Sequence, residues 1–241
     1  MARVSRLFAL VLALLGLGGA GAQGYGFSPT VLGIAPAGNL STQTTMLNAG
    51  QTPATFRVVP VRWRMVGGQS VLEETRDLIV NPASFTLAPG ASQVIRVGLR
   101  KKPGDTELSY RLLVQEVPGE ATATAQTDLG EGRSLNVQLS LSFSLPLYVT
   151  PPGAQAQVAA TVSRDGDDLV VLLRNSGRRR ATYGTLLAGR GGEPLALPSF
   201  AVLAGAEYTL RLPGLGAGTG PLTLSYRDAE GREVRETLAV P

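Results

Sequence analysis

The sequence predicts an all-β protein made of two β-sandwich domains. Apolar stretches with a period of two residues recur along the chain, separated by Gly, Pro and Asn turn signals about 8–12 residues apart. No stretch shows the period of about 3.6 residues that marks a sustained amphipathic helix. Val149-Thr150-Pro151-Pro152-Gly153 interrupts the pattern, and its tandem prolines predict a stiff link between the two domains.

The N-terminal segment predicts export. Arg3 and Arg6 precede an apolar stretch at residues 7–17, and Ala20-Gly21-Ala22 fits a small-residue cleavage site. The apolar stretch is shorter than the roughly 18 residues of a membrane span, so residues 1–22 are expected to be a signal peptide that is removed. An uncleaved anchor is the alternative. The remaining chain of about 219 residues suits two domains of about 100 residues each.

Composition disfavours most catalytic classes. The chain has no histidine and no cysteine, so it lacks the commonest general base and metal ligand and forms no disulfide. Loss of Arg3 and Arg6 lowers the formal net charge from +4 to +2, which is too small to indicate nucleic-acid binding. The one dense basic run, Arg178-Arg179-Arg180, is expected to be a solvated turn. We therefore expect no enzyme activity, no metal and no cofactor.

Acidic residues leave a glycosidase formally open, because that chemistry needs only two carboxylates at the right separation. The candidates are expected in turns or exposed positions: Glu73, Glu74, Asp77, Glu116, Glu120, Asp165, Asp167 and Asp168. Residues 164–168 are predicted to form a hairpin turn. This segment loosely resembles a calcium loop but lacks the downstream glutamate at the required spacing.

Residues 23–150 are predicted to form the first domain. Strands are expected at residues 30–34, with an interruption at Gly33, and at residues 44–47, 54–64, 85–87, 94–100 and 110–117. Turns are expected at Asn48-Ala49-Gly50 and Pro89-Gly90. Residues 119–133 lack periodicity and are expected to be a long mobile loop, which is often functional in a compact domain.

One alternating run carries the functional argument. Every second residue between 135 and 149 is apolar: Leu135, Val137, Leu139, Leu141, Phe143, Leu145, Leu147 and Val149. Such alternation places all eight side chains on one face of a strand. At about 3.3 Å per residue the run would span roughly 50 Å, against about 17–20 Å for an ordinary strand. Part of the apolar face is therefore expected to bind another molecule; a bent strand shared by two sheets, with Pro146 at the bend, is the alternative.

Residues 151–241 are predicted to form the second domain, with strands at residues 169–173, 181–187, 208–212, 222–226 and 234–240. An internal repeat relates the two halves. Asn48-Ala49-Gly50 followed by Ala54-Thr55-Phe56 matches Asn175-Ser176-Gly177 followed by Ala181-Thr182-Tyr183 at the same spacing. It predicts a strand that ends in an Asn-x-Gly turn, with glycine tolerating a positive φ.

Four segments resemble the periplasmic pilus-assembly chaperones of the chaperone–usher pathway, in particular a divergent branch of that family. They are Ser28-Pro29-Thr30, residues 81–97, Tyr110-Arg111-Leu112 with Glu116-Val117-Pro118, and Leu145-Pro146-Leu147-Tyr148-Val149. The resemblance covers most of residues 23–152. It implies two immunoglobulin-like sandwiches set at an angle, a periplasmic location, and a seventh strand that is lent to a pilus or fibre subunit before delivery to an outer-membrane usher.

The resemblance also implies a site. The subunit-binding residues are predicted to be Leu135, Val137, Leu139, Leu141 and Phe143, whereas Leu145 and Leu147 should pack within the protein itself. Many family members grip the C-terminal carboxylate of the subunit with a basic pair, but Val31 and Pro146 occupy those positions here. Arg111 is predicted to be the carboxylate anchor, with Arg96 as a second candidate and a purely structural role for Arg111 as the alternative.

Two rival functions are carried alongside this prediction. An exported immunoglobulin-like adhesion or carbohydrate-binding module should expose aromatic platforms, yet Trp63 is the single tryptophan and aromatic residues make up 5% of the chain. An exported hydrolase is disfavoured by the missing histidine. The expected partners are pilus or fibre subunits and an usher, without nucleic acid and without membrane insertion.

Overall fold

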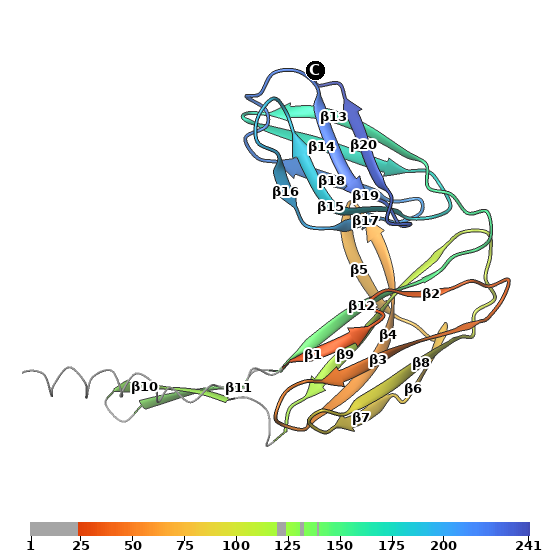
Figure 1. Ribbon diagram of the computed structural model, residues 1–241, viewed down its shortest axis with the longest axis vertical. Helices are drawn as coiled ribbons and strands as arrows, with labels where there is room; N and C mark the ends of the chain where they lie inside the picture. The colour runs from red at the N-terminus through yellow and green to blue at the C-terminus, as the bar shows by residue number, and fades with distance from the viewer. Residues whose placement is uncertain (1–23, 120–123, 131–132, 139) are drawn as a thin grey trace, which may run out of the picture.

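The protein is all-β in the computed structural model, which describes residues 24–119, 124–130, 133–138 and 140–241 (Figure 1). These ranges contain strands and no helix, so none of them supplies a helix that could cross a membrane. The strands are β1 Tyr25–Ser28, β2 Leu32–Ile34, β3 Ser41–Asn48, β4 Ala54–Val66, β5 Gln69–Glu74, β6 Leu78–Asn81, β7 Ser84–Leu87, β8 Ser92–Leu99, β9 Leu108–Val117, β10 Thr124–Gly130, β11 Arg133–Gln138, β12 Ser142–Val149, β13 Val158–Asp165, β14 Asp168–Asn175, β15 Ala181–Gly189, β16 Leu195–Leu197, β17 Phe200–Val202, β18 Glu207–Leu212, β19 Leu222–Arg227 and β20 Glu233–Leu238.

The first sandwich packs two sheets face to face. One has the order β1-β3-β8-β6, and the other has the order β2-β12-β9-β4-β5 with β7 also paired to β4. Alternate residues of each strand face the space between the sheets, as a period of two requires. The fully buried side chains of this core include Phe56, Ile95, Tyr110, Leu112 and Leu147.

The first part of the chain serves both sheets, which the sequence did not predict. β1 pairs with β3 in one sheet, whereas β2 pairs with β12 in the other. The strand predicted over residues 30–34 is shorter than expected, because β2 covers only Leu32–Ile34, and Gly33 lies inside β2 and does not interrupt it. Ser28 ends β1, and Pro29 and Thr30 connect the two sheets, so this segment does not open a strand.

The second sandwich joins a sheet of order β13-β14-β18 to a sheet of order β16-β15-β19-β20, with β17 also paired to β15. Its own core contains the fully buried side chains of Leu169, Val171, Leu173, Leu212 and Leu222. Figure 1 shows the two sandwiches set at an angle, with the C-terminus at the far end of the second. The strands predicted after residue 168 are present, whereas β13, β16 and β17 were not predicted.

The Asn-x-Gly repeat has a physical cause in both domains. Asn48 ends β3 and Asn175 ends β14, and both residues are almost fully buried. Each side-chain oxygen accepts the backbone N–H of the following glycine, at 2.9 Å for Gly50 and 3.0 Å for Gly177. Neither glycine has a positive φ, so the predicted reason was wrong. Gly177 is required by space instead, because a Cβ there would lie 2.4 Å from the Gln155 carbonyl oxygen.

Asn175 should be among the most sensitive polar positions of the second domain. Its amide donates to the carbonyl oxygens of Arg179, Val202 and Leu203 at 2.8, 3.0 and 3.2 Å. Asn175→Ala removes these donors and should lower the free energy of unfolding by about 2–3 kcal/mol, because buried carbonyl groups lose their partners. Ser176→Ala, at the exposed neighbour, should change it by less than about 0.5 kcal/mol. Urea denaturation measures both, and equal effects would contradict this account.

A domain boundary near Pro151 stays a prediction. The first core is built from residues up to Val149, and the second draws on residues from Val158 onward. We expect limited proteolysis to cut first within residues 119–133 and to leave compact products from both halves. Mass spectrometry of the products checks this, and simultaneous loss of both halves would speak against two separately stable cores.

Candidate functional site

The predicted alternating strand is two strands in the structure. β12 begins at Ser142, and the preceding strand, β11, ends at Gln138 and pairs with β10 in a separate two-stranded sheet. The prediction of one continuous strand over residues 135–149 was therefore wrong. The expected loop at residues 119–133 was also wrong in part, because Thr124–Gly130 forms β10. Figure 1 shows the β10–β11 hairpin extending away from the first sandwich.

The predicted subunit-binding residues lie on both sides of this division. In β11, Leu135 pairs with Thr127 and Val137 pairs with Ala125. Leu139 lies outside the described residues. Leu141 precedes β12 and keeps 37% of its surface exposed.

Toward the end of β12, the apolar side chains of the alternating run lie in the core. Phe143 is half-buried, with its ring centroid 5.1 Å from that of Phe27 and 5.9 Å from that of Tyr25. Leu145 is 5% exposed and Leu147 is fully buried. The prediction that Leu145 and Leu147 pack within the protein is confirmed.

Part of the outer edge of β12 carries no partner strand. The Leu141 carbonyl accepts the Glu116 N–H at 2.8 Å, so odd-numbered residues direct their backbone groups toward β9. Thr150 donates its N–H to the Ile34 carbonyl on the other side at 3.0 Å, so even-numbered residues face outward. β2 covers this side only from Leu147 to Val149. Among the described residues, no strand pairs with the remainder, which we call the open edge: the outward backbone groups of Ser142 and Ser144.

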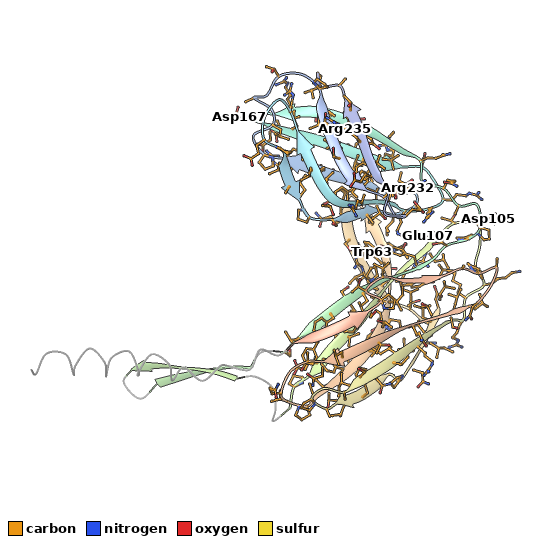
Figure 2. The ribbon with its side chains drawn as sticks, viewed as in Figure 1. Trp63, Asp105, Glu107, Asp167, Arg232 and Arg235 are labelled. Atoms are coloured by element: carbon orange, nitrogen blue, oxygen red, sulfur yellow. The ribbon has the colours of Figure 1, made fainter. Side chains whose placement is uncertain are left out.

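The end of β12 beyond this edge forms the contact between the domains. Trp63 and Tyr148 from the first domain pack with Leu203 and Ala206 from the second, and each of the four is less than 9% exposed. Figure 2 shows Trp63 between the two sandwiches, close to the level of Glu107. We call these four residues the interdomain cluster. It joins the two domains at the end of β12.

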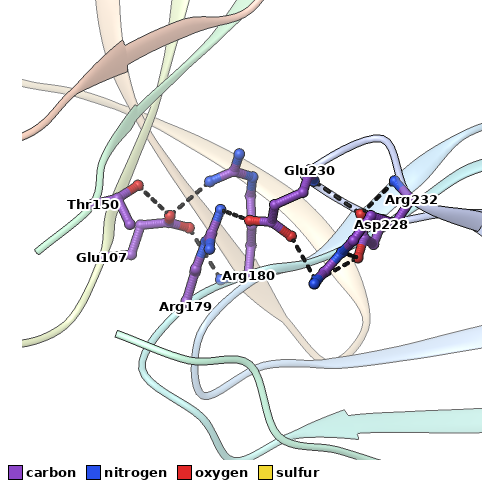
Figure 3. Close-up of polar contacts among 7 residues, drawn as sticks. All are labelled: Glu107, Thr150, Arg179, Arg180, Asp228, Glu230 and Arg232. Carbon is purple, nitrogen blue, oxygen red and sulfur yellow. Dashed lines mark hydrogen bonds and ion pairs between the residues drawn. The ribbon is translucent and has the colours of Figure 1, made fainter. Parts of the chain in front are cut away.

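A buried ion pair lies beside this cluster (Figure 3). A carboxylate oxygen of Glu107 lies 2.6 Å from Arg180 Nη1, with side-chain exposures of 0% and 11%. Glu107 also accepts the Arg180 N–H at 3.0 Å and the Thr150 hydroxyl at 2.6 Å. Its own N–H donates to the Arg178 carbonyl at 2.8 Å. These bonds satisfy the buried carboxylate and tie the domains together.

The basic run was misassigned as a solvated turn. Arg180 also lies over the ring of Tyr148, 3.5 Å from its centroid, and Arg179 forms an ion pair with Glu230 at 2.6 Å. The Arg180 side chain therefore joins the two domains, whereas the Arg179 ion pair lies within the second domain. Nothing in the local sequence marked Glu107 as the partner of Arg180, because it lies 73 positions away.

Arg111 lies beside the interdomain cluster, on the outer face of β9. Its guanidinium is 3.9 Å from the centroid of the Trp63 ring, and burial lowers its pKa below the ordinary value. Within the described part of the chain, no carboxylate forms an ion pair with it. Its backbone partner in β12 is Pro146. Arg96, the second candidate anchor, lies in β8 of the opposite sheet, and Val31 is 51% exposed just before β2.

Several of the candidate carboxylates have structural partners within the described residues. Glu116 is only 6% exposed and accepts the Leu141 N–H at 3.1 Å, so its predicted exposure was wrong. Residues 164–168 form the predicted hairpin turn, with Asp165 paired to Asp168 and Gly166 at a φ of 60°. Arg211 lies 2.7 Å from Asp165 and 2.8 Å from Asp168. Glu120 lies outside the described residues.

Comparison with solved structures places this fold among pilus chaperones. The CsuC–CsuE chaperone–tip adhesion subunit complex from the archaic Csu pili of Acinetobacter baumannii matches with a TM-score of 0.66 at 17% identity, over 90% of this chain and 99% of that chain. The chaperone DraB of E. coli gives 0.60 at 18% identity, over 91% and 97%. The SafA pilin–SafB chaperone complex of Salmonella enterica gives 0.60 at 16% identity, over 90% and 97%. The likeness establishes two immunoglobulin-like sandwich domains.

Sequence comparison identifies the family. No curated protein matches the chain. The family described as "Pili and flagellar-assembly chaperone, PapD N-terminal domain" matches residues 29–155. This match spans more than half of the 241 residues and includes the open edge of β12, Arg111 and Glu107. The chain belongs to the pili and flagellar-assembly chaperones.

Proposed function

We propose that the protein stabilises pilus or surface-fibre subunits by donor-strand complementation and delivers them to an outer-membrane usher. The observation that carries the proposal is the open edge of β12, next to which the side chain of Leu141 is exposed. Unpaired N–H and C=O groups on a sheet edge are ready to pair with another strand. A subunit that lacks one strand of its own sandwich has the complementary need.

The chemistry of this interaction is ordinary burial and hydrogen bonding. Ser142 and Ser144 supply backbone donors and acceptors, while Leu135, Val137, Leu139 and Leu141 supply side chains for the groove of the subunit. At roughly 1.5–3 kcal/mol for each buried large aliphatic side chain, four of them contribute on the order of 6–12 kcal/mol before ordering costs. This is enough to hold a subunit folded and still permits exchange against a strand that fits better.

The same proposal assigns the protein to the periplasm, after removal of residues 1–22, and makes it a binding protein without enzymatic activity. The rival adhesion or carbohydrate-binding function would need exposed aromatic side chains. Trp63 is instead 6% exposed within the interdomain cluster. Co-expression with exported small β proteins from the same source, followed by co-purification, identifies the subunit.

Leu141→Asp should abolish capture while leaving the fold intact. The side chain is 37% exposed in the free protein, so the charge is tolerated there, whereas the same charge in an apolar groove costs several kcal/mol. Leu139→Asp should behave in the same way. Leu187→Asp is the matched control, because Leu187 is also 37% exposed but lies in β15 of the second domain.

Co-purification of the subunit and thermal unfolding of the free protein measure the two effects. We expect a loss of at least tenfold in captured subunit for Leu141→Asp and little change for Leu187→Asp. If the free Leu141→Asp protein unfolds while its folded fraction still captures the subunit, the apolar side chains of the alternating run belong to the core of the protein and do not bind the subunit.

Arg111 is proposed as the anchor for the C-terminal carboxylate of the subunit. It is a half-buried cation on the outer face of the sheet, beside Pro146 and without a carboxylate partner among the described residues. Burial makes the charged guanidinium costly by itself, and a carboxylate of the partner would compensate that cost. The contact with Trp63 equally fits a structural role, so the experiment must separate the two roles.

Arg111→Ala should weaken binding of a subunit with a free C-terminal carboxylate by about tenfold, the scale of a charge-assisted hydrogen bond. A subunit extended by one C-terminal glycine amide has no carboxylate at this position, so the substitution should not affect its binding. Calorimetric titration of both subunits against both chaperones completes a double-mutant cycle. An equal loss for the two subunits assigns Arg111 to packing against Trp63.

A further inference from the structure

The sheet β1-β3-β8-β6 has an outer face without a carboxylate. Its four strands contain neither aspartate nor glutamate, and residues 24–72 and 78–104 contain none either. In β8, Ile95 and Val97 are fully buried, so Arg96 between them faces outward and is exposed. No acidic side chain of the sheet offsets its charge.

Four more cations lie where β8 ends and β6 begins. Arg100 and Lys101 donate their backbone N–H groups to the Asp77 carbonyl at 2.7 and 3.3 Å, which brings them beside Arg76. Lys102 follows in the chain, and all four cationic side chains are exposed. We call the whole set the basic patch: Arg76, Arg96, Arg100, Lys101 and Lys102.

Only part of this charge is compensated within the described residues. Lys101 Nζ lies 3.6 Å from Asp77 Oδ2, and the other four cations form no ion pair there. The same carboxylate is shared, because it accepts the Tyr110 hydroxyl at 2.8 Å and lies 3.7 Å from Arg62 Nη1. Asp105 is the next acidic residue along the chain. The basic patch therefore keeps a surplus of positive charge.

Two exposed aliphatic side chains accompany the basic patch. Ile79 is 54% exposed, pairs with Gly98 of β8 and lines the same hollow as Arg96. Leu40 is 45% exposed, and its carbonyl accepts the Leu99 N–H at 2.8 Å. Aliphatic side chains beside uncompensated cations are the composition that adsorbs to the interface of an anionic membrane.

We infer that the basic patch, with Ile79 and Leu40, adsorbs to membrane surfaces rich in anionic lipids, without insertion. This surface activity goes beyond the proposed function. Mobile lipid headgroups need many cations near one plane but no fixed spacing between them. An acidic side chain of a protein partner is bound best by donors held in a fixed geometry. Among the described residues, no hydrogen bond orients the guanidinium groups of Arg76, Arg96 and Arg100, which favours the membrane.

The basic patch lies across the sandwich from the open edge of β12 (Figure 1). β6 is at one end of its sheet and β1 at the other. The rings of Tyr25 and Phe27, in β1, contact the ring of Phe143 in β12. A molecule adsorbed through the basic patch therefore keeps its open edge accessible, so membrane adsorption and strand pairing are compatible.

Co-sedimentation of the protein with lipid vesicles tests the inference. Vesicles of equal parts phosphatidylglycerol and phosphatidylcholine are compared with vesicles of phosphatidylcholine alone, at about 0.05 M and about 0.5 M salt. At low salt we expect at least about tenfold more protein on the anionic vesicles. High salt should remove most of this difference, because it screens exposed charges.

Charge reversal locates the surface. Arg100→Glu combined with Lys102→Glu should lower binding to the anionic vesicles by at least about tenfold. Arg57→Glu combined with Arg235→Glu is the matched control, because it changes the net charge equally but lies in β4 and β20. The control should lower binding by less than about threefold. Thermal unfolding verifies that both proteins are folded.

Replacement of one aliphatic side chain tests the apolar part of the surface. Ile79→Ser should lower binding to the anionic vesicles by about two- to fivefold, because less apolar area enters the interface. Leu72→Ser is the matched control: Leu72 is 45% exposed but lies in β5 of the other sheet. It should bind as the unaltered protein does, and an equal loss in both variants would contradict the assigned surface.

Amine acetylation tests the same surface without a substitution. Lys101 and Lys102 are the only lysines of the chain, so their acetylation reports on the basic patch directly. Anionic vesicles should slow it at least about threefold in the bound protein, because the amines lie against the headgroups. Mass spectrometry of the peptide that contains both lysines measures the rate.

Three results would overturn the inference. Equal losses in the two charge-reversed proteins, or unslowed acetylation of bound protein, would show that net charge alone drives binding. Binding of a soluble oligo-aspartate peptide without binding to vesicles would assign the basic patch to an acidic protein segment. None of these measurements involves the open edge, so the proposed function stands or fails separately.

Discussion

Backbone hydrogen bonding along β12 constrains the architecture of the first domain. One side of the strand is bonded to β9 throughout, whereas the other is bonded to β2 only over its last residues. A sandwich can leave such an edge open only at a risk of unwanted pairing. Here the division coincides with Pro146. After this residue, Leu147 packs in the core; before it, Ser142 and Ser144 have unpaired backbone groups on the open edge. The same strand therefore stabilises its own domain and carries the proposed binding site.

The second constraint is the fixed relation between the domains. The side chain of Glu107 is fully buried, and its carboxylate accepts hydrogen bonds from Arg180 and Thr150. Removing Arg180 would therefore leave an uncompensated buried charge. Trp63 and Tyr148 pack against the second domain. The guanidinium group of Arg111 lies over the ring of Trp63, and that of Arg180 lies over the ring of Tyr148. A rigid junction keeps the end of the open edge and Arg111 at a constant distance. That geometry suits recognition of a strand terminus.

The sequence predicted the features that depend on local periodicity and missed those that depend on distant partners. Alternation correctly placed Leu145 and Leu147 in the core, and the Asp165–Asp168 hairpin followed from its turn residues. Alternation could not show that the run is divided before Ser142, because it does not reveal which strand pairs with which. β10 had no periodic signal in its sequence, so its pairing with β11 could not be predicted. Arg180 was predicted to be solvated because its partner, Glu107, is distant in the sequence and lies beside it only in the folded protein.

The central claim, that a subunit strand pairs with the open edge, is tested most directly by amide hydrogen exchange at Ser142 and Ser144. Exchange is measured on the free protein and on its complex with a co-purified subunit. The account predicts that both amides exchange at least tenfold more slowly in the complex, because each gains a backbone acceptor, while the amides of Phe143 and Leu145, already facing β9, change little. Unchanged exchange at Ser142 and Ser144 in a saturated complex would contradict strand pairing at this edge.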